Sequence, residues 1–224
     1  MTDIELVVLD MAGTTVLDDG LVLDAFTAAV TEVGVERDSA EFDRMLAYVN
    51  ETMGQSKIVV FRALLDGDEQ RAASANAAFE ARYDELVHNG HCAPVPGAEE
   101  LITRLRAAGV KVAFVTGFGR QTQDAILTAL GWNSLADLAL TPADAGRGRP
   151  FPDLVLASVL RTRTTDVRRV AVLGDTPSDV LTGLRAGASI VAGVLTGAGS
   201  RAELEAAGAT HVLDSVADLP GILG

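Results

Sequence analysis

The stretch Leu6-Val7-Val8-Leu9-Asp10-Met11-Ala12-Gly13-Thr14-Thr15 decides the fold class of this 224-residue chain. Its first four residues are apolar without alternation, which is typical of a strand buried on both faces of a parallel sheet. The run ends in Asp10, and a carboxylate at the carboxyl end of such a strand stands at the edge where open α/β sheets bind ligands. An ordinary strand-to-turn transition would look the same, because Asp and Gly are common turn formers. Later segments of the chain decide between the two interpretations.

Composition indicates a globular protein. Hydrophobic residues make up 48% of the chain and charged residues 22%, which favours a folded core over disorder. The formal net charge of -13 disfavours nucleic acid and anionic membranes as partners, because like charges repel. From the sequence we expect no internal disulfide at the single Cys92, no signal peptide and no membrane span. The simplest expectation is a soluble cytoplasmic protein whose oligomeric state stays open, a homodimer included.

The spacing of apolar residues predicts two kinds of structure in one chain. Between residues 20 and 91 it is helical throughout and predicts helices over 21–33, 39–50, 51–65 and 69–87. From residue 96 onward helical segments alternate with short apolar strands, which predicts a doubly wound parallel sheet. We therefore predict an α/β core domain from residues 1–17 and 96–224. Residues 18–95 are predicted to form an all-helical cap domain inserted after the first strand.

Three predicted strands end in polar groups that a fold alone does not require. These groups are Asp10, Thr116-Gly117 and Gly174-Asp175, with Asp179 just beyond the last and Arg149 between the last two. The carboxyl ends of parallel strands share one edge, so we expect the groups to meet. The carboxylates suit Mg²⁺, and Thr116, the Gly117 N–H and Arg149 suit phosphate oxygens. This combination predicts phosphoryl transfer.

The same residues carry a family resemblance. Asp10-Met-Ala-Gly-Thr-Thr, Val115-Thr116-Gly117, Gly148-Arg149-Pro150 and Gly174-Asp175-xxx-Asp179 resemble, in order, the four motifs of the haloacid dehalogenase superfamily. The resemblance covers nearly the whole chain and implies a Rossmann-like core, with Asp10 as a nucleophile that forms an aspartyl-phosphate. It implies that Mg²⁺ is held by Asp10, the Ala12 carbonyl oxygen and Asp175, with Asp179 in support. It further implies that the substrate is bound by Thr14, Thr116, Gly117 and Arg149.

Two departures from the commonest motifs point to a subfamily. Most phosphatases of the superfamily carry a second aspartate, the general acid, where this chain has Ala12. Arg149 stands where most members have lysine. Both features, together with Met53-Gly54-Gln55-Ser56-Lys57, resemble the phosphonoacetaldehyde hydrolases (phosphonatases), which cleave a carbon–phosphorus bond. The resemblance implies that Lys57 is a catalytic Schiff-base lysine, that Met53 contacts the substrate, and that the substrate is phosphonoacetaldehyde or a related small phosphonate.

Lys57 also has independent physical support. On a helix it would share a face with Met53 and Phe61, and the apolar residues 58–60 would surround it. Desolvation disfavours the ammonium form, so a nucleophilic amine becomes easier to reach. An iminium would accept the electrons of the breaking C–P bond, so that no acid is needed at Ala12. The alternative is a lysine whose stem lies along an apolar surface.

Three positions depart from the phosphonatase pattern and leave the substrate open. Val60 stands in place of a histidine, Phe118 in place of a tyrosine, and no cysteine follows the first motif. The alternatives are a phosphomonoesterase on a small phosphorylated metabolite and a catalytically silent protein that binds a phosphorylated ligand. Whether Lys57 reaches the cleft also stays open.

Four weaker signals receive a structural interpretation. Asp18-Asp19 is expected to form a solvated hinge. Residues 197–202 match a loose dinucleotide fingerprint, but a tight turn explains them better. The three histidines lack the spacing of a zinc site, and Cys92 is expected to be a bystander thiol.

Overall fold

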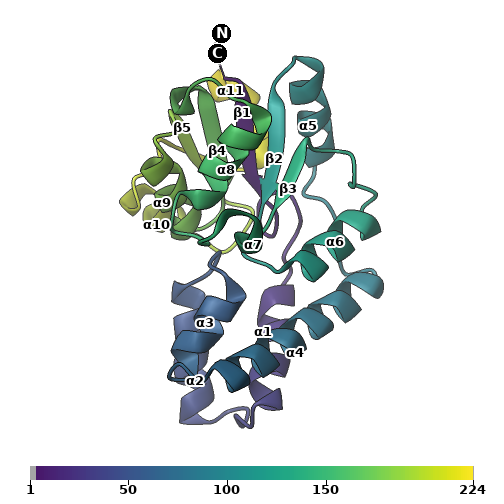
Figure 1. Ribbon diagram of the computed structural model, residues 1–224, viewed down its shortest axis with the longest axis vertical. Coiled ribbons are helices and arrows are strands. Elements are labelled where there is room, and N and C mark those ends of the chain that lie inside the picture. Colours follow the sequence, from purple (N-terminus) through teal and green to yellow (C-terminus); the bar gives the residue numbers. More distant parts are fainter. Residues whose placement is uncertain (1–3, 224) are drawn as a thin grey trace.

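In the computed structural model, which describes residues 4–223, a six-stranded parallel sheet forms one half of the protein (Figure 1). The strand order β3-β2-β1-β4-β5-β6 confirms the predicted doubly wound α/β class. The strands are β1 (Leu6–Asp10), β2 (Lys111–Val115), β3 (Leu138–Leu140), β4 (Val170–Gly174), β5 (Ile190–Val194) and β6 (His211–Leu213). Residues 1–3 and 224 of the predicted core range lie outside the described residues.

The central position of β1 determines where its last residue points. Asp10 pairs with Val115 at the end of β2, and Leu9 pairs with Leu173 near the end of β4. The residues that follow β2 and β4 therefore emerge on either side of Asp10. The strand order reverses at β1, and ligands bind at such a switch point in open α/β sheets.

Helices cover both faces of the sheet, which is why every residue of β1 is buried. Val7 and Leu9 belong to the apolar cluster that includes α5 (Ala98–Ala107) and α6 (Arg120–Ala129), whereas Leu6 and Val8 pack with α8 (Asp153–Thr162). The remaining helical elements of this half are α7 (Pro142–Ala145), α9 (Pro177–Ala186), α10 (Arg201–Ala206), α11 (Pro220–Leu223) and the 3₁₀ turns Val167–Arg169 and Val216–Asp218. The continuous apolar run of β1 thus reports burial on two faces, as predicted.

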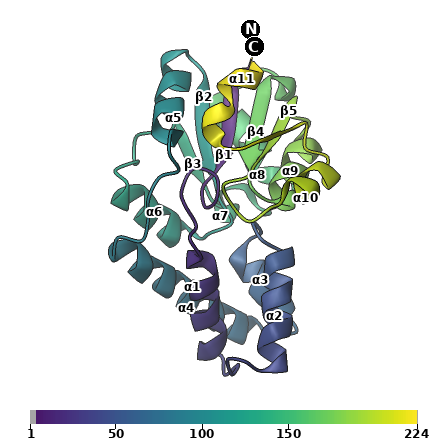
Figure 2. The ribbon, with the colours of Figure 1, turned by 180° about the vertical axis from the view of Figure 1, so that it is seen from behind.

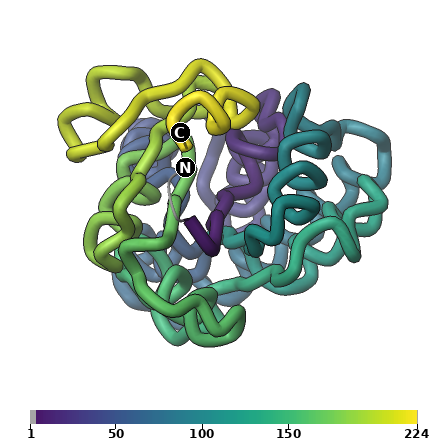
Figure 3. Tube along the Cα trace, turned by 90° about the horizontal axis from the view of Figure 1, so that it is seen from above, coloured from purple at the N-terminus to yellow at the C-terminus, as the bar shows by residue number. Residues whose placement is uncertain are grey.

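Four helices form a second half, called here the helical block. They are α1 (Leu21–Glu32), α2 (Ala40–Glu51), α3 (Lys57–Leu64) and α4 (Glu69–His88). The block lies below the sheet in the front and back views (Figures 1 and 2) and behind it in the view from above (Figure 3). No strand occurs within residues 20–91, as the sequence predicts.

The predicted helix over 51–65 is wrong in its first half. Helix α2 continues to Glu51, a turn follows, and α3 begins only at Lys57. Gly54 has φ +80°, a left-handed conformation that cannot continue a right-handed helix. Met53 therefore lies in the turn rather than on the helix with Lys57, and the helical spacing argued for that pair does not apply.

Two adjacent segments connect the helical block to the sheet. Leu17 N–H donates to Ala93 O at 2.9 Å, and Val95 N–H donates to Thr15 O at 2.9 Å. The predicted boundaries at 17/18 and 95/96 fall in these segments, and the division into two domains stays a prediction. Within residues 4–223, none of the helices combines the length and the hydropathy that a membrane crossing requires.

Candidate active site

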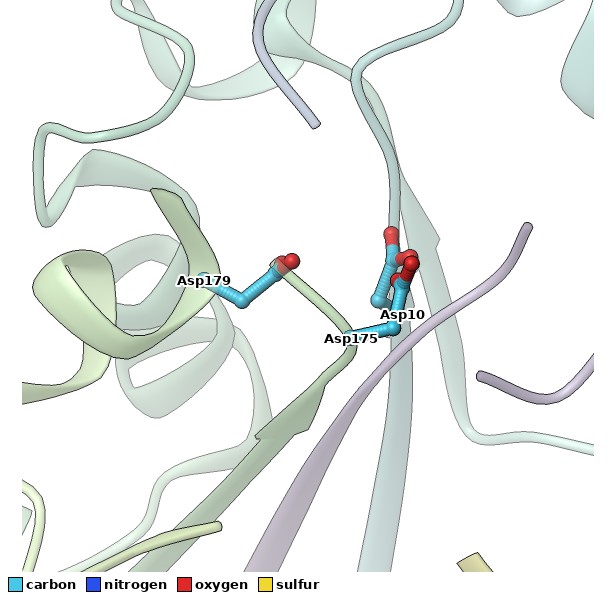
Figure 4. Close-up of side chains that lie close together, drawn as sticks. All are labelled: Asp10, Asp175 and Asp179. Atoms are coloured by element: carbon cyan, nitrogen blue, oxygen red, sulfur yellow. The ribbon is translucent and has the colours of Figure 1, made fainter. Parts of the chain in front are cut away.

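Three buried carboxylates meet at the carboxyl edge of the sheet (Figure 4). Asp10 ends β1, Asp175 directly follows β4, and Asp179 lies in the first turn of α9. One oxygen from each lies within 4.8 Å of the others, and none of the three residues is more than 4% exposed. The predicted convergence of Asp10 and Asp175 is therefore present, because β1 and β4 are hydrogen-bonded neighbours.

Local hydrogen bonds fix the orientation of two of these carboxylates. The Asp175 carboxylate accepts from the Ala198 N–H at 2.8 Å and from the Thr14 hydroxyl at 3.2 Å. Asp179 accepts from the Thr176 hydroxyl at 2.5 Å, within a capping box that begins α9. Thr14 thus supports Asp175 in this structure, and its predicted contact with substrate stays a prediction.

The charge of this cluster fits a divalent cation. Burial, with the nearby carboxylates of Asp10 and Asp179, raises the pKa of Asp175 well above its usual range. Burial also raises the pKa of Asp179 to about 6, although Arg149 opposes the shift. A cation among three hard oxygen donors would relieve this repulsion and suits Mg²⁺ chemistry. Ala12, whose carbonyl is a predicted ligand, lines the same cavity.

Arg149 links the carboxylates to the helical block. Its guanidinium is buried and lies 2.5 Å from Asp10 Oδ1 and 2.6 Å from Asp179 Oδ1. A third nitrogen, Nη1, donates to the carbonyl of Gly54 at 3.0 Å. One planar side chain therefore neutralises two acids and holds the turn before α3, a geometry that a lysine could not reproduce.

Thr116 and Gly117 follow β2 on the other side of Asp10. The Thr116 hydroxyl oxygen accepts from the Phe118 N–H at 3.1 Å and keeps its own hydrogen for a further acceptor. A Cβ on Gly117 would lie 2.4 Å from the carbonyl oxygen of Gln55. Only glycine at this position permits the turn before α3 to come so close. The close approach places this turn over the predicted phosphate-binding groups.

Lys57 lies in the same cavity as Asp10, which answers the question that the sequence left open. About 370 Å³ of empty space is lined by Asp10, Ala12, Asp18, Val22, Met53, Gly54, Lys57, Thr116, Gly117, Phe118, Arg149, Asp175, Thr176 and Ala198. The Lys57 amine stands 5.5 Å from the ring centroid of Phe118 and 5.7 Å from that of Phe79. Desolvation lowers the pKa of Lys57 to about 8, against the opposing charges of Asp18 and Asp10.

The apolar surroundings of Lys57 differ from those expected. Val59, one of the three residues predicted to enclose the amine, is 49% exposed. The enclosing walls are Phe79 from α4 and Phe118 from the loop after β2, two rings that also contact each other with centroids 6.2 Å apart. Sequence spacing around Lys57 could not identify them, because both are distant along the chain.

Asp18 is a cavity residue that the sequence interpretation missed. The sequence predicts that it is solvated together with Asp19, yet it is partly buried and lines the cavity beside Lys57. Its carboxylate accepts from the Val22 N–H at 3.1 Å, at the start of α1. Burial raises the pKa of Asp18. The available signal was its place just before an apolar helix, where an acid caps free N–H groups and is thereby held in position.

The weaker motifs resolve as structural features. The loop at 197–200 follows a turn at 195–196 and leads into α10, where Ser200 caps the helix and accepts from Glu203 N–H. The Ala198 N–H in this loop supports Asp175. Cys92 is a partly buried free thiol whose pKa is raised to about 11 by burial, which makes it a poor nucleophile.

The close approach of Gly54 gives a first testable prediction. A Cβ at Gly54 would lie 2.5 Å from the Thr176 hydroxyl oxygen, so Gly54→Ala must displace the turn that carries Met53 and precedes Lys57. We expect kcat/KM to fall by about 10²-fold, as misplacement by about 1 Å does in other sites. Gly67→Ala is the matched control, because Gly67 has φ +78° with open space around it. Equal losses in the two variants would contradict the prediction.

The chain is similar to known proteins in both sequence and fold. The model of a family of hydrolases, the haloacid dehalogenase-like hydrolases, matches residues 4–187. A phosphonoacetaldehyde hydrolase of Bacillus cytotoxicus is 30% identical over 213 residues, which cover 87% of this chain and 76% of the relative. The crystal structure of a phosphonoacetaldehyde hydrolase-like protein from Oleispira antarctica has a TM-score of 0.82 and 26% identity, covering 99% of this chain and 91% of that one. A predicted phosphoglycolate phosphatase from Haemophilus somnus has a TM-score of 0.80 with 21% identity and full coverage of both chains, a likeness of fold alone.

Proposed function

The chain belongs to the haloacid dehalogenase-like hydrolases, and from that premise we propose that it cleaves the carbon–phosphorus bond of phosphonoacetaldehyde or a related small phosphonate. One observation carries the proposal. The Lys57 amine and the Asp10 carboxylate line a single cavity in which the methyl group of Ala12 stands where a phosphatase of the superfamily would hold its acid. An enamine carbon can leave from phosphorus without taking up a proton at that step. Formation of the enamine requires an amine such as Lys57.

The first chemical step forms the imine. The neutral Lys57 amine attacks the aldehyde carbon, and uptake of one proton from solvent with loss of water leaves an iminium joined to Nζ. The Asp18 carboxylate supplies the largest charge effect on Lys57, and in this cavity it favours the cationic iminium over the neutral amine. The iminium then sits two bonds from the phosphorus atom and withdraws electrons from the C–P bond.

The second step transfers phosphorus to the protein. Asp10 attacks the phosphorus atom, the C–P bond breaks, and its electron pair moves into the iminium to give an enamine on Lys57. Arg149 and Thr116 bind the equatorial phosphoryl oxygens. Mg²⁺, held by Asp10, Asp175 and the Ala12 carbonyl with Asp179 in support, would neutralise charge between the attacking carboxylate and the phosphonate.

Two hydrolyses complete the cycle. Protonation and hydrolysis of the enamine release acetaldehyde and restore Lys57, and water cleaves the aspartyl-phosphate at Asp10 to release phosphate. The net reaction is phosphonoacetaldehyde plus water giving acetaldehyde plus phosphate. The test is Mg²⁺-dependent formation of both products in equal amounts, and purified protein that forms neither would refute the proposal.

A second candidate function is favoured by Asp18. Its carboxyl lines the cavity and has a pKa raised by burial, so it could protonate the leaving oxygen of a phosphomonoester in place of the acid missing at Ala12. Efficient hydrolysis of phosphoglycolate or sugar phosphates that depends on Asp18 and not on Lys57 would establish this alternative. A catalytically silent protein would release phosphate from neither class of substrate.

The pKa of Lys57 predicts the pH dependence of phosphonate cleavage. Only the neutral amine attacks the carbonyl, and the pKa of Lys57 is lowered to about 8 by desolvation and the nearby Arg149, against Asp18, Asp10 and Asp175. We therefore expect kcat/KM for phosphonoacetaldehyde to rise with pH and to level off above about pH 8, near that pKa. Hydrolysis of p-nitrophenyl phosphate, which needs no imine, is the comparison reaction. If kcat/KM rises with pH in the same way for both substrates, the titrating group is not Lys57.

A further inference from the structure

A second cavity adjoins the catalytic one behind Lys57. It is small and shares two lining residues, Val22 and Lys57, with the catalytic cavity. We call it the annex. Its other lining residues are Phe26, Val49, Thr52, Val60, Phe61 and Phe79. The space left inside it accommodates a group about the size of one methyl or one water molecule.

The annex is apolar apart from the lysine. Six of its apolar lining residues come from helices α1, α2, α3 and α4 and are at most 5% exposed. The hydroxyl of Thr52 already donates to the carbonyl of Tyr48 at 2.7 Å. A water molecule in the annex would find few partners there, whereas an alkyl group would be favourably buried.

The Lys57 amine lies at the boundary between the two cavities. It is nearly equidistant from Phe118, which lines the catalytic cavity, and from Phe79, which lines the annex. An imine carbon on Nζ carries two substituents. One is the CH₂–P group that must reach Asp10, so the other is directed away from Asp10, on the side of the annex. In an aldehyde that second substituent is only a hydrogen atom.

Resting on the proposed function, we propose that the preferred substrates are short 2-oxoalkylphosphonates, ketones of the form R–CO–CH₂–PO₃²⁻ in which R is methyl. Lys57 condenses with the ketone, with uptake of one proton and loss of water, to form a protonated ketimine. R occupies the annex, and Asp10 takes the phosphorus atom as before. The C–P electron pair moves into the ketiminium to give an enamine, which takes up a proton and is hydrolysed. The balance is R–CO–CH₂–PO₃²⁻ plus water giving the methyl ketone R–CO–CH₃ and phosphate.

The test compares 2-oxopropylphosphonate with phosphonoacetaldehyde in the full-length protein with Mg²⁺. The measured quantity is the ratio of kcat/KM for the ketone to that for the aldehyde, which is independent of the folded fraction of a sample. Val60 lines the annex and is 5% exposed, so Val60→Leu should fill the space meant for R. We expect this variant to lower the ratio by about tenfold or more, the usual effect of one misplaced methylene in an apolar pocket. Val59→Leu, at the exposed neighbour, should leave the ratio at its wild-type value.

The outcomes separate this inference from the proposed function. Release of acetone and phosphate from the ketone, with a wild-type ratio above one that only Val60→Leu lowers, supports it. A wild-type ratio below one overturns it. Cleavage of the aldehyde without cleavage of the ketone overturns the inference and leaves the proposed function standing. Ketone cleavage with a ratio that Val60→Leu does not change also overturns it, because R would then lie elsewhere. Cleavage of neither compound refutes both proposals.

Discussion

Replacing Asp10 by asparagine is expected to abolish phosphate release from every substrate of this protein. Asp10 ends the central strand, is 4% exposed, and is the proposed nucleophile toward phosphorus. An amide oxygen of the same shape is a far weaker nucleophile and carries no negative charge. We expect kcat to fall by about 10⁴-fold or more, as it does when a covalent nucleophile is removed from other enzymes.

Folding should survive this substitution. Arg149 keeps its ion pair with Asp179 at 2.6 Å and its hydrogen bonds to Val115 O and Gly54 O. Burial and the neighbouring carboxylates raise the pKa of Asp175, and removing the Asp10 charge lessens the second of these effects.

The matched control is Asp19→Asn, which makes the same chemical change at an exposed position near the cavity. The measurements are the single-turnover rate, the thermal midpoint and phosphorylation of the intact protein by mass spectrometry. Turnover by Asp10→Asn within one order of magnitude of the wild-type rate would exclude Asp10 as nucleophile and with it the mechanism proposed above.

The fold and the acidic cluster could be predicted because both depend on short-range signals. A continuous apolar run in β1 requires helices on both sides, and alternation of strands and helices then requires a parallel sheet. Parallel strands bring their carboxyl ends to one edge, so the positions of Asp10 and Asp175 follow from their places in the sequence alone. Asp179 follows as well, since a Thr–x–x–Asp capping box fixes it at the start of α9.

The surroundings of Lys57 could not be predicted, because they depend on how the helical block packs against the sheet. Phe79 and Phe118 come from opposite halves of the molecule, and both rings, with centroids 5.7 and 5.5 Å from the amine, help to desolvate it. The turn at Gly54 has the same origin, since its close approach to Thr176 lies between segments distant in sequence. Asp18 was misjudged for a related reason: a polar residue in a connecting segment is usually solvated, but here the segment borders the cavity.

Two departures from the phosphonatase pattern take on a physical meaning in this structure. Phe118, in place of a tyrosine, forms one of the rings that enclose the amine, and Val60, in place of a histidine, lines the annex. Both therefore make the environment of Lys57 more apolar. An apolar environment lowers the pKa of Lys57 and leaves proton transfer to Asp18, a carboxyl that lines the cavity outside the acidic cluster.

Lys57→Arg is the second substitution for which a large loss is expected. Arginine keeps the positive charge and much of the length, but its guanidinium stays protonated and cannot form an imine. We expect cleavage of phosphonoacetaldehyde to fall by about 10³-fold or more, equivalent to about 4 kcal/mol of activation free energy. Substrates that need no imine should lose much less, since Asp10, Arg149 and the acidic cluster are untouched.

Borohydride trapping makes this prediction unusually direct, because the chain contains only two lysines, Lys57 and Lys111. Lys111 is half-exposed and pairs with Asp137 at 3.4 Å, so Lys111→Arg is the matched control. Reduction in the presence of substrate should attach one two-carbon group to Lys57 in the wild type and in Lys111→Arg, and none in Lys57→Arg. An adduct on Lys111 alone, or full phosphonate turnover by Lys57→Arg, would remove the imine from the mechanism. Asp10 would then have to displace a leaving group that is activated by protonation, and Asp18 lines the cavity as the acid for that step.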